Sequence, residues 1–250
     1  GFVAASSGNH GLAVSYIANL VGTDATIVVP TTAVEEKVAA IEEYGARVVK
    51  HGFFHDERMA KALEIQKNTG ATFIHPFDDP DVIAGQGTIG LEICEDLPDV
   101  NTVIVPIGGG GLISGISTAI KSLKPSAKVI GVEPERASSM HQSIKNGRIT
   151  RLQDTTTLAE GLAAREPGEN TFEIVKRNVD VILLVEEEQI EKAVYTVMKE
   201  CHLLVEPSAA AAFAGLIHKW HPRVEEKIVV VVSGANFSVK ILGRILSKYS

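Results

Sequence analysis

Several features that would define a class of protein are scarce in this sequence or missing from it. It has only two cysteines, Cys94 and Cys201, which are far apart and match no metal-binding or redox spacing. We expect both to be reduced, buried thiols in a cytoplasmic protein. The formal net charge is -7 and there is no basic block, which argues against nucleic-acid binding. No apolar run approaches membrane-spanning length, and the VVVV run at 229–232 is only strand-sized.

Two patterns alternate along the 250 residues. Short β-branched bursts without polar alternation are typical of strands that are buried on both faces. Between them lie amphipathic segments with helical spacing, as at 34–44, 57–68 and 190–199. Strands separated by helices indicate right-handed crossovers and doubly wound parallel sheets in an α/β fold. The expected strands are 25–29, 46–50, 71–75, 102–106, 128–132, 181–185 and 228–232.

A polar junction marked by proline, DDPD at 78–81, divides the chain. We expect a smaller α/β domain at 1–79 and a larger one at 80–250. The sequence opens on a strand-like burst that runs at once into a glycine turn, so we expect further sequence upstream. That segment would complete the larger domain on its N-terminal side. Without it, apolar sheet surface would be uncovered and the isolated chain poorly soluble.

The strongest motif is IGGGGLISG at 107–115, which follows the strand expected at 102–106 and opens a helix expected at 112–122. Four consecutive glycines remove every Cβ from the turn, so backbone N–H groups can close on an anion at the helix N-terminus. This geometry suits a phosphate group. A turn without a ligand is one alternative. A dinucleotide-binding domain with Glu133 as the ribose partner is another.

Two further turns between strand and helix carry polar side chains. SSGNHG at 6–11 offers hydroxyl, amide and backbone N–H groups that would hold a carboxylate, although an ordinary helix cap has the same residues. SGAN at 233–236 places Ser233 at the carboxyl end of an expected strand, where open α/β sheets bind ligands. A serine that caps a helix at 239–247 is the alternative there.

The order SSGNHG, GGGGL, VEPSA (205–209) and SGAN resembles the fold type II enzymes that depend on pyridoxal phosphate (PLP), in the tryptophan synthase β superfamily. Their threonine dehydratase and serine racemase group is the best match. AGQGT at 84–88, GVEPE at 131–135 and LAEGLAAREPGENTF at 158–172 support the resemblance, which spans essentially the whole chain. It implies β-elimination of serine or threonine to a 2-oxo acid and ammonia, with serine racemisation as a second activity. It also implies a cytoplasmic homodimer or larger homo-oligomer.

The resemblance implies roles for the cofactor-binding residues. Asn9 would hydrogen-bond the phenolic oxygen of PLP, and Ser233 would face its pyridine nitrogen. A neutral hydroxyl there does not enforce a protonated ring, which is a weaker electron sink and suits elimination. Glu206 would lie near the ring. The cofactor phosphate would be bound by the backbone N–H groups of Gly108, Gly109, Gly110, Gly111 and Leu112.

The resemblance also implies a substrate site. Ser7 would be the acid and base of a racemase, but only a binding residue in relatives that are dehydratases alone. The residues around the substrate carboxylate would be Ser6, Ser7, Gly8 and His10.

Two departures from the family pattern bear on the chemistry. Related racemases bind a divalent cation through the Glu of GVEP, a backbone carbonyl and a further acidic residue. Here Glu133 and Ala137 match, but the third position is Ser139, so a Mg²⁺ or Ca²⁺ site is expected only with an incomplete ligand set.

The second departure concerns the lysine that binds PLP covalently. The family carries it upstream of SSGNHG, and none of the lysines here lies in such a setting. We expect it in a segment before Gly1. Without it, these residues would bind PLP or an amino acid but would not catalyse elimination.

Overall fold

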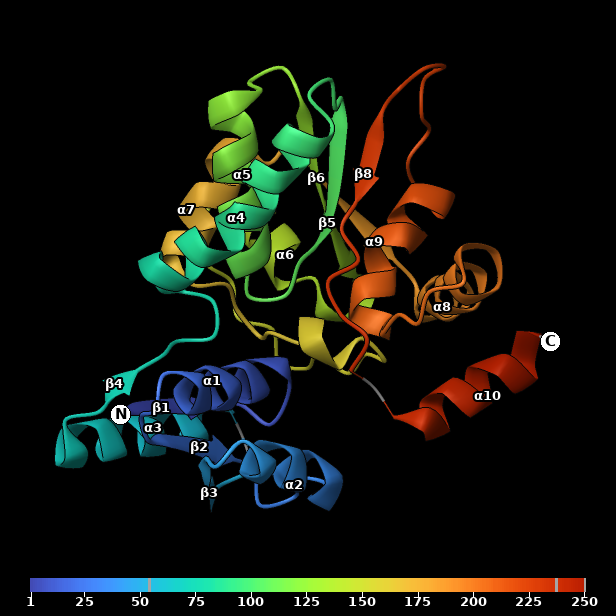
Figure 1. Ribbon diagram of the computed structural model, residues 1–250. Helices are drawn as coiled ribbons and strands as arrows, with labels where there is room; N and C mark the ends of the chain where they lie inside the picture. Colours follow the sequence, from blue (N-terminus) through green and yellow to red (C-terminus); the bar gives the residue numbers. More distant parts are fainter. Residues whose placement is uncertain (54, 237, 250) are drawn as a thin grey trace. The chain divides into compact units, whose positions relative to one another are not determined.

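The computed structural model describes residues 1–53, 55–236 and 238–249, and it divides into two compact units, Gly1–Asp79 and Pro80–Ser250 (Figure 1). Each unit contains a four-stranded sheet in which all neighbouring strands are parallel. Helices pack on both faces of each sheet. The prediction of doubly wound parallel α/β units is therefore confirmed.

The first unit has the strand order β3-β2-β1-β4. Alternate residues of β1 and β2 face opposite sides, as the period of a strand requires. Ala4 and Ile27 pack against α1 and α2, whereas Val3 and Val28 pack against α3. The elements are β1 (Phe2–Ala5), α1 (Asn9–Leu20), β2 (Ala25–Val29), α2 (Glu35–Glu43), β3 (Arg47–Lys50), α3 (His55–Thr69) and β4 (Thr72–Phe73).

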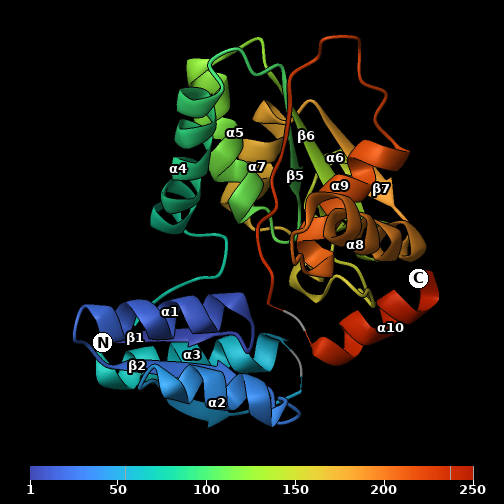
Figure 2. The same cartoon turned by 45° about the vertical axis from the view of Figure 1, so that its right-hand side comes forward.

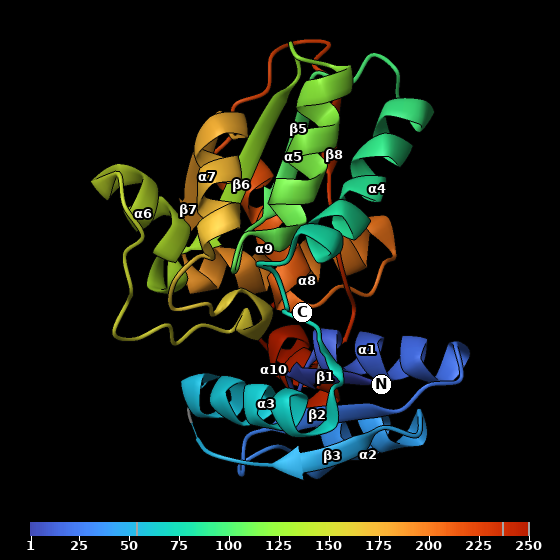
Figure 3. The ribbon, with the colours of Figure 1, turned by 90° about the vertical axis from the view of Figure 1, so that its left-hand side faces the viewer.

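The second unit has the order β7-β6-β5-β8. Val103 and Val105 face the side covered by α4, α5 and α7, and Ile104 faces the side covered by α8 and α9 (Figures 2 and 3). The elements are α4 (Pro80–Asp96), β5 (Thr102–Pro106), α5 (Gly111–Leu123), β6 (Lys128–Pro134), η1 (Glu135–Ala137), α6 (Ser139–Asn146), η2 (Glu160–Leu162), α7 (Glu169–Asn178), β7 (Val181–Val185), α8 (Glu187–Cys201), α9 (Pro207–His218), β8 (Ile228–Val230) and α10 (Val239–Tyr249).

Both units are wound in the same way. The first strand of each sheet lies between the second and the fourth, so the chain reverses its direction of winding between β1 and β4 and again between β5 and β8. In an open α/β sheet, ligands bind beyond the carboxyl ends of the strands at this switch point. The loops that follow β1 and β4 meet at that position in the first unit. In the second unit, the loops after β5 and β8 leave neighbouring strands there.

The predicted strands agree with the structure in position, and several of them differ at their ends. Strands 25–29, 102–106 and 181–185 have the predicted bounds, and β6 continues to Pro134 because it pairs with β7 as far as Val185. β4 is shorter than predicted because β1 pairs with it only through Phe2 and Val3. In the described residues, no helix combines the length and apolar character needed to cross a bilayer.

Candidate functional site

The loop after β5 presents a run of backbone N–H groups without acceptors. Gly110 has a left-handed backbone (φ 96°) and precedes the thirteen-residue helix α5. The first hydrogen bond of that helix runs from the Ser114 N–H to the Gly110 carbonyl at 2.9 Å. Across the described chain, no acceptor takes the N–H groups of residues 108–112. N–H groups that point together at a helix N-terminus form an anion-binding nest.

Close packing explains why this loop consists of glycine. A Cβ on Gly108 would lie 3.0 Å from the carbonyl oxygen of Gly161. On Gly110 it would lie 2.6 Å from Cε of Met140 and 2.9 Å from Cβ of Thr171. The first turn of α5 reads GLIS, so it contains no acidic residue to repel an anion. The unpaired donors and the small size of the loop residues fit the phosphate group of PLP.

The loop after β8 carries Ser233 to the same edge of the sheet. β8 neighbours β5, and the Val231 N–H extends the pairing by donating to the Ile104 carbonyl at 2.9 Å. Two residues later Ser233 is exposed. The Gly234 carbonyl accepts the N–H of Glu206 at 3.0 Å, which joins the VEPSA and SGAN motifs. The structure thus brings Ser233, Glu206 and the glycine loop to the switch point of one sheet.

The SSGNHG loop occupies the equivalent place in the first unit. Gly8 is the N-cap of α1, and its N–H donates to Oγ of Ser6 at 3.2 Å. A Cβ on Gly11 would lie only 2.3 Å from the Ser6 carbonyl oxygen, so α1 can approach the end of β1 only with glycine there. Ser7 is half-buried and Asn9, the first residue of α1, is exposed. This geometry keeps hydroxyl groups and a helix N-terminus close together, as a carboxylate site requires.

His10 links this loop to the strand on the other side of the switch point. Its Nε2 lies 3.0 Å from the carbonyl oxygen of Ile74, directly after β4. Because a carbonyl only accepts, Nε2 carries the proton and Nδ1 is an acceptor. Burial lowers the pKa of His10, and the nearby His75 lowers it further. His10 is therefore a neutral side chain that fixes the loop. The role of Ile74 was not predicted, because it depends on the order of the strands.

Glu133, a predicted metal ligand, is fully buried and caps α6. Its Oε1 accepts the N–H of Met140 at 2.9 Å, and its Oε2 accepts that of His141 at 2.8 Å. Burial raises the pKa of this carboxyl to about 8, although the hydrogen bonds from the two N–H groups act to lower it. A carboxyl group whose two oxygens cap a helix is not available to a ribose, which removes the basis for the dinucleotide alternative.

The predicted metal site has no further support in the described part of the chain, where no three His, Cys, Asp or Glu residues cluster. The carbonyl of Ala137 belongs to η1, directly before α6. Cation binding at Glu133 and Ala137 therefore stays a prediction.

Several of the described lysines contact groups outside these loops. Lys128 lies over the ring of Trp220 and Lys176 over that of Phe172. Lysine side chains donate hydrogen bonds from Lys50 to Glu35, Lys61 to Glu64, Lys121 to Asp180 and the Ala127 carbonyl, Lys227 to Asp99, and Lys248 to Glu191. The ion pairs are Lys50–Glu35, Lys61–Glu64, Lys121–Asp180, Lys199–Glu200, Lys227–Asp99 and Lys248 with Glu188 and Glu191.

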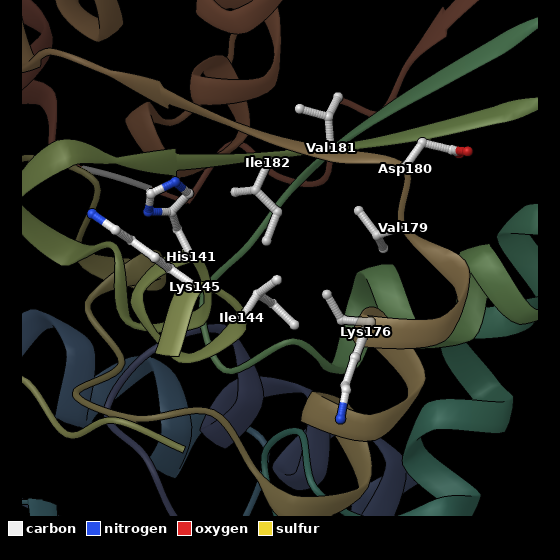
Figure 4. A pocket seen from close by; sticks show the side chains of 9 residues that line it. His141, Ile144, Lys145, Lys176, Val179, Asp180, Val181 and Ile182 are labelled. Carbon is white, nitrogen blue, oxygen red and sulfur yellow. The ribbon is translucent and has the colours of Figure 1, made fainter. Parts of the chain in front are cut away.

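A cavity of about 230 Å³ lies elsewhere in the second unit, among α6, α7 and β7 (Figure 4). His141 and Lys145 project from α6 at one end of it, and the Asp180 carboxylate points away. Its link to the predicted site residues is His141, whose N–H donates to Glu133. The lining consists of His141, Ile144, Lys145, Val175, Lys176, Val179, Asp180, Val181 and Ile182.

Comparison with known proteins identifies the family of this fold. The family described as "Pyridoxal-phosphate dependent enzyme" matches residues 1–234. L-threonine ammonia-lyase of Thermotoga maritima is 47% identical over 248 residues, which are 99% of this chain and 62% of that protein. The chain belongs to the family of pyridoxal-phosphate dependent enzymes, and it spans 62% of the length of this curated relative.

Solved structures show the same relationship. Threonine deaminase isoform 2 from Solanum lycopersicum has a TM-score of 0.92 at 38% identity, covering 100% of this chain and 74% of that one. Maize serine racemase also has a TM-score of 0.92, at 36% identity, with 100% and 77% covered. The predicted family and cofactor class are confirmed, whereas the roles of individual residues stay predictions.

Proposed function

We propose that this chain provides the cofactor-binding and substrate-binding loops of a PLP-dependent ammonia-lyase. The reaction is the β-elimination of threonine or serine to a 2-oxo acid and ammonia. The observation that carries the proposal is the run of unpaired N–H groups at 108–112, at the switch point of a doubly wound sheet. The similarity to L-threonine ammonia-lyase and to threonine deaminase supports the choice of reaction.

The second unit would hold the cofactor. The N–H groups of residues 108–112 and the positive end of α5 would bind its phosphate. Ser233 would meet the pyridine nitrogen with a neutral hydroxyl. The family resemblance gives Asn9 the role of a hydrogen-bond partner of the phenolic oxygen. When bound, PLP supplies an electron sink for the charge that develops at the α-carbon of the substrate.

The loop after β1 would bind the substrate. The Ser6 hydroxyl, the loop N–H groups and the N-terminus of α1 suit a carboxylate, and neutral His10 holds the loop to Ile74 without adding a charge. In elimination, the Ser7 hydroxyl would bind and orient the amino acid. In serine racemisation, Ser7 would take or return the α-proton on one face. Similarity to maize serine racemase favours this second activity.

The alternative is a protein that holds PLP and an amino acid reversibly and does not eliminate. The proposed phosphate and carboxylate contacts are made by backbone N–H groups and hydroxyls, which would serve reversible binding as well. Reduction with borohydride followed by peptide mass spectrometry distinguishes the two, together with an assay of 2-oxo acid release from L-threonine and L-serine. A lyase gives a PLP-labelled lysine and 2-oxo acid, whereas a reversible binder gives neither but still binds PLP. Failure to bind PLP at all would contradict both.

Assembly, compartment and cation binding complete the proposal. We place the protein in the cytoplasm because both cysteines are free, with Cys94 buried and Cys201 exposed. A homodimer or larger homo-oligomer follows from the family resemblance, and the mass in solution tests it. Stabilisation by Mg²⁺ or Ca²⁺, lost in Glu133→Gln, would support a cation at Glu133 and Ala137.

A further inference from the structure

The segment LAEGLAAREPGENTF at 158–172 has no part in the proposed chemistry, yet both of its ends pack against the glycine loop. Near its start, Gly161 lies so close to Gly108 that a Cβ there would be 3.0 Å from the Gly161 carbonyl oxygen. The N–H of Gly161 donates in turn to Oγ of Ser208 in VEPSA at 3.0 Å. Near its end, the Thr171 hydroxyl lies 2.8 Å from the Gly109 carbonyl oxygen, and a Cβ on Gly110 would lie 2.9 Å from Cβ of Thr171. The loop is thus supported from two sides.

The Thr171 hydroxyl makes the polar contact. Thr171 is fully buried, and its Oγ1 lies 2.8 Å from the Gly109 carbonyl oxygen. The same oxygen accepts the N–H of Gly168 at 3.0 Å and lies 3.2 Å from the Gly168 carbonyl. A hydroxyl has a single proton to donate. The shorter distance assigns it to Gly109, since Gly168 already contributes a donor to this oxygen.

This hydrogen bond fixes a peptide plane of the phosphate loop. In a trans peptide, the C=O and the following N–H point in opposite directions. With the Gly109 carbonyl held by Thr171, the N–H of Gly110 points to the side of the loop away from α7. The direction of a donor in the nest thus depends on a residue 62 positions along the chain.

We infer that Thr171 is a positioning residue of the phosphate loop, whose hydroxyl aims the Gly110 N–H at the phosphate group of the cofactor. The inference rests on the proposed phosphate binding at 108–112. It predicts that Thr171 contributes to the preference for phosphorylated over unphosphorylated ligands. A role in stability alone would leave that preference unchanged.

The test compares dissociation constants for PLP and for pyridoxal, which lacks the phosphate, in purified variants. Thr171→Val removes the hydroxyl and keeps the shape, and Thr171→Ser keeps the hydroxyl. Thr118→Val is the matched control, because Thr118 Oγ1 also lies 2.8 Å from a carbonyl, that of Ser114, but within α5 and outside the loop. Unfolding temperatures establish that each variant is folded.

We expect Thr171→Val to weaken PLP binding about tenfold, as loss of one buried hydrogen bond predicts, and pyridoxal binding less than about twofold. Thr171→Ser and Thr118→Val should keep the preference of the wild type. An equal loss for both ligands, or an unchanged preference in Thr171→Val, would overturn the inference. If the wild type itself does not prefer PLP to pyridoxal, the proposed phosphate site fails instead. If Thr171→Val does not fold, the affinity of Thr171→Ser for inorganic phosphate is measured instead. The inference predicts that this variant binds phosphate, because it keeps the hydroxyl. Loss of phosphate binding in Thr171→Ser would contradict the inference.

Discussion

The two units have the same winding and carry different chemistry at the same place. In each, the first strand lies beside the fourth at the switch point of the sheet, so the loops that follow them leave from neighbouring strands. The loop of the second unit is built of glycine and offers backbone N–H groups, whereas the loop of the first offers hydroxyl, amide and imidazole side chains. Under the proposed function, the winding determines where a ligand binds, and the loop determines its kind: a phosphate in one unit and an amino acid in the other.

The loops also differ in how they are held. In the second unit, η2 and α7 press against Gly108 and Gly110, so backbone donors are fixed by packing from elements distant in sequence. In the first unit, the loop is held by the close packing of Gly11 against the Ser6 carbonyl and by the hydrogen bond between His10 and the Ile74 carbonyl. Substitutions in the loop of the second unit should therefore change both packing and cofactor binding, whereas substitutions in the loop of the first unit should change mainly substrate binding.

The largest effect is expected from Gly110→Ala. The new Cβ would meet Met140 and Thr171 and would require φ 96°, which disfavours every residue with a side chain. We expect the free energy of unfolding to fall by about 1–3 kcal/mol. We also expect PLP to bind about 100-fold more weakly, because the displaced loop loses charge-assisted hydrogen bonds to the phosphate. Denaturant titration and PLP fluorescence measure the two.

The matched control is Gly147→Ala. Gly147 also has a positive φ, 67°, but a Cβ there would meet nothing within 4 Å. It should lose some stability and keep the affinity for PLP. Equal loss of PLP affinity in both variants would mean that the glycine loop has no special role.

A smaller and more selective effect is expected from Gly11→Ala. Because the new Cβ would lie 2.3 Å from the Ser6 carbonyl, α1 must move away from β1 and displace the SSGNHG loop. We expect about tenfold weaker binding of L-threonine and unchanged affinity for inorganic phosphate. Gly22→Ala, at the end of α1 in open space, is the control. Calorimetric titration with each ligand separates the outcomes, and a parallel loss of phosphate affinity would contradict the division of roles.

The smallest effect on binding, and a distinct effect on stability, is expected from Glu133. Its pKa is raised by burial from the usual value to about 8, so the folded state binds a proton that the unfolded state releases. Stability from this group is therefore present below the unfolded pKa and is lost as pH rises toward 8. Glu133→Gln should remove this decline between about pH 4.5 and 8 while lowering stability at low pH. The same slope in the variant and the wild type would assign it to another group.

Much of this architecture follows from local pattern. Strands such as 102–106 and 181–185 were predictable because they are buried on both faces, and a run of four glycines between a strand and a helix is typical of a turn that binds an anion. The sequence did not show that the SGAN loop follows a strand next to that of the glycine loop, because this depends on the order of strands in the sheet. Thr171 gave no signal, because its partner Gly109 is 62 residues away. The helix cap formed by Glu133 was not predicted for a related reason. The sequence alone does not show whether a glutamate caps a helix or binds a metal ion.

The proposed function depends above all on the backbone N–H groups of residues 108–112, which must bind the phosphate group of PLP. Amide resonances of the labelled protein report on these groups one by one, in titrations with PLP, pyridoxal and inorganic phosphate. We predict that the N–H signals of Gly108 to Leu112 shift with PLP and with phosphate and do not shift with pyridoxal. Signals in this loop that stay unchanged with PLP, or that respond equally to pyridoxal, would contradict phosphate binding there.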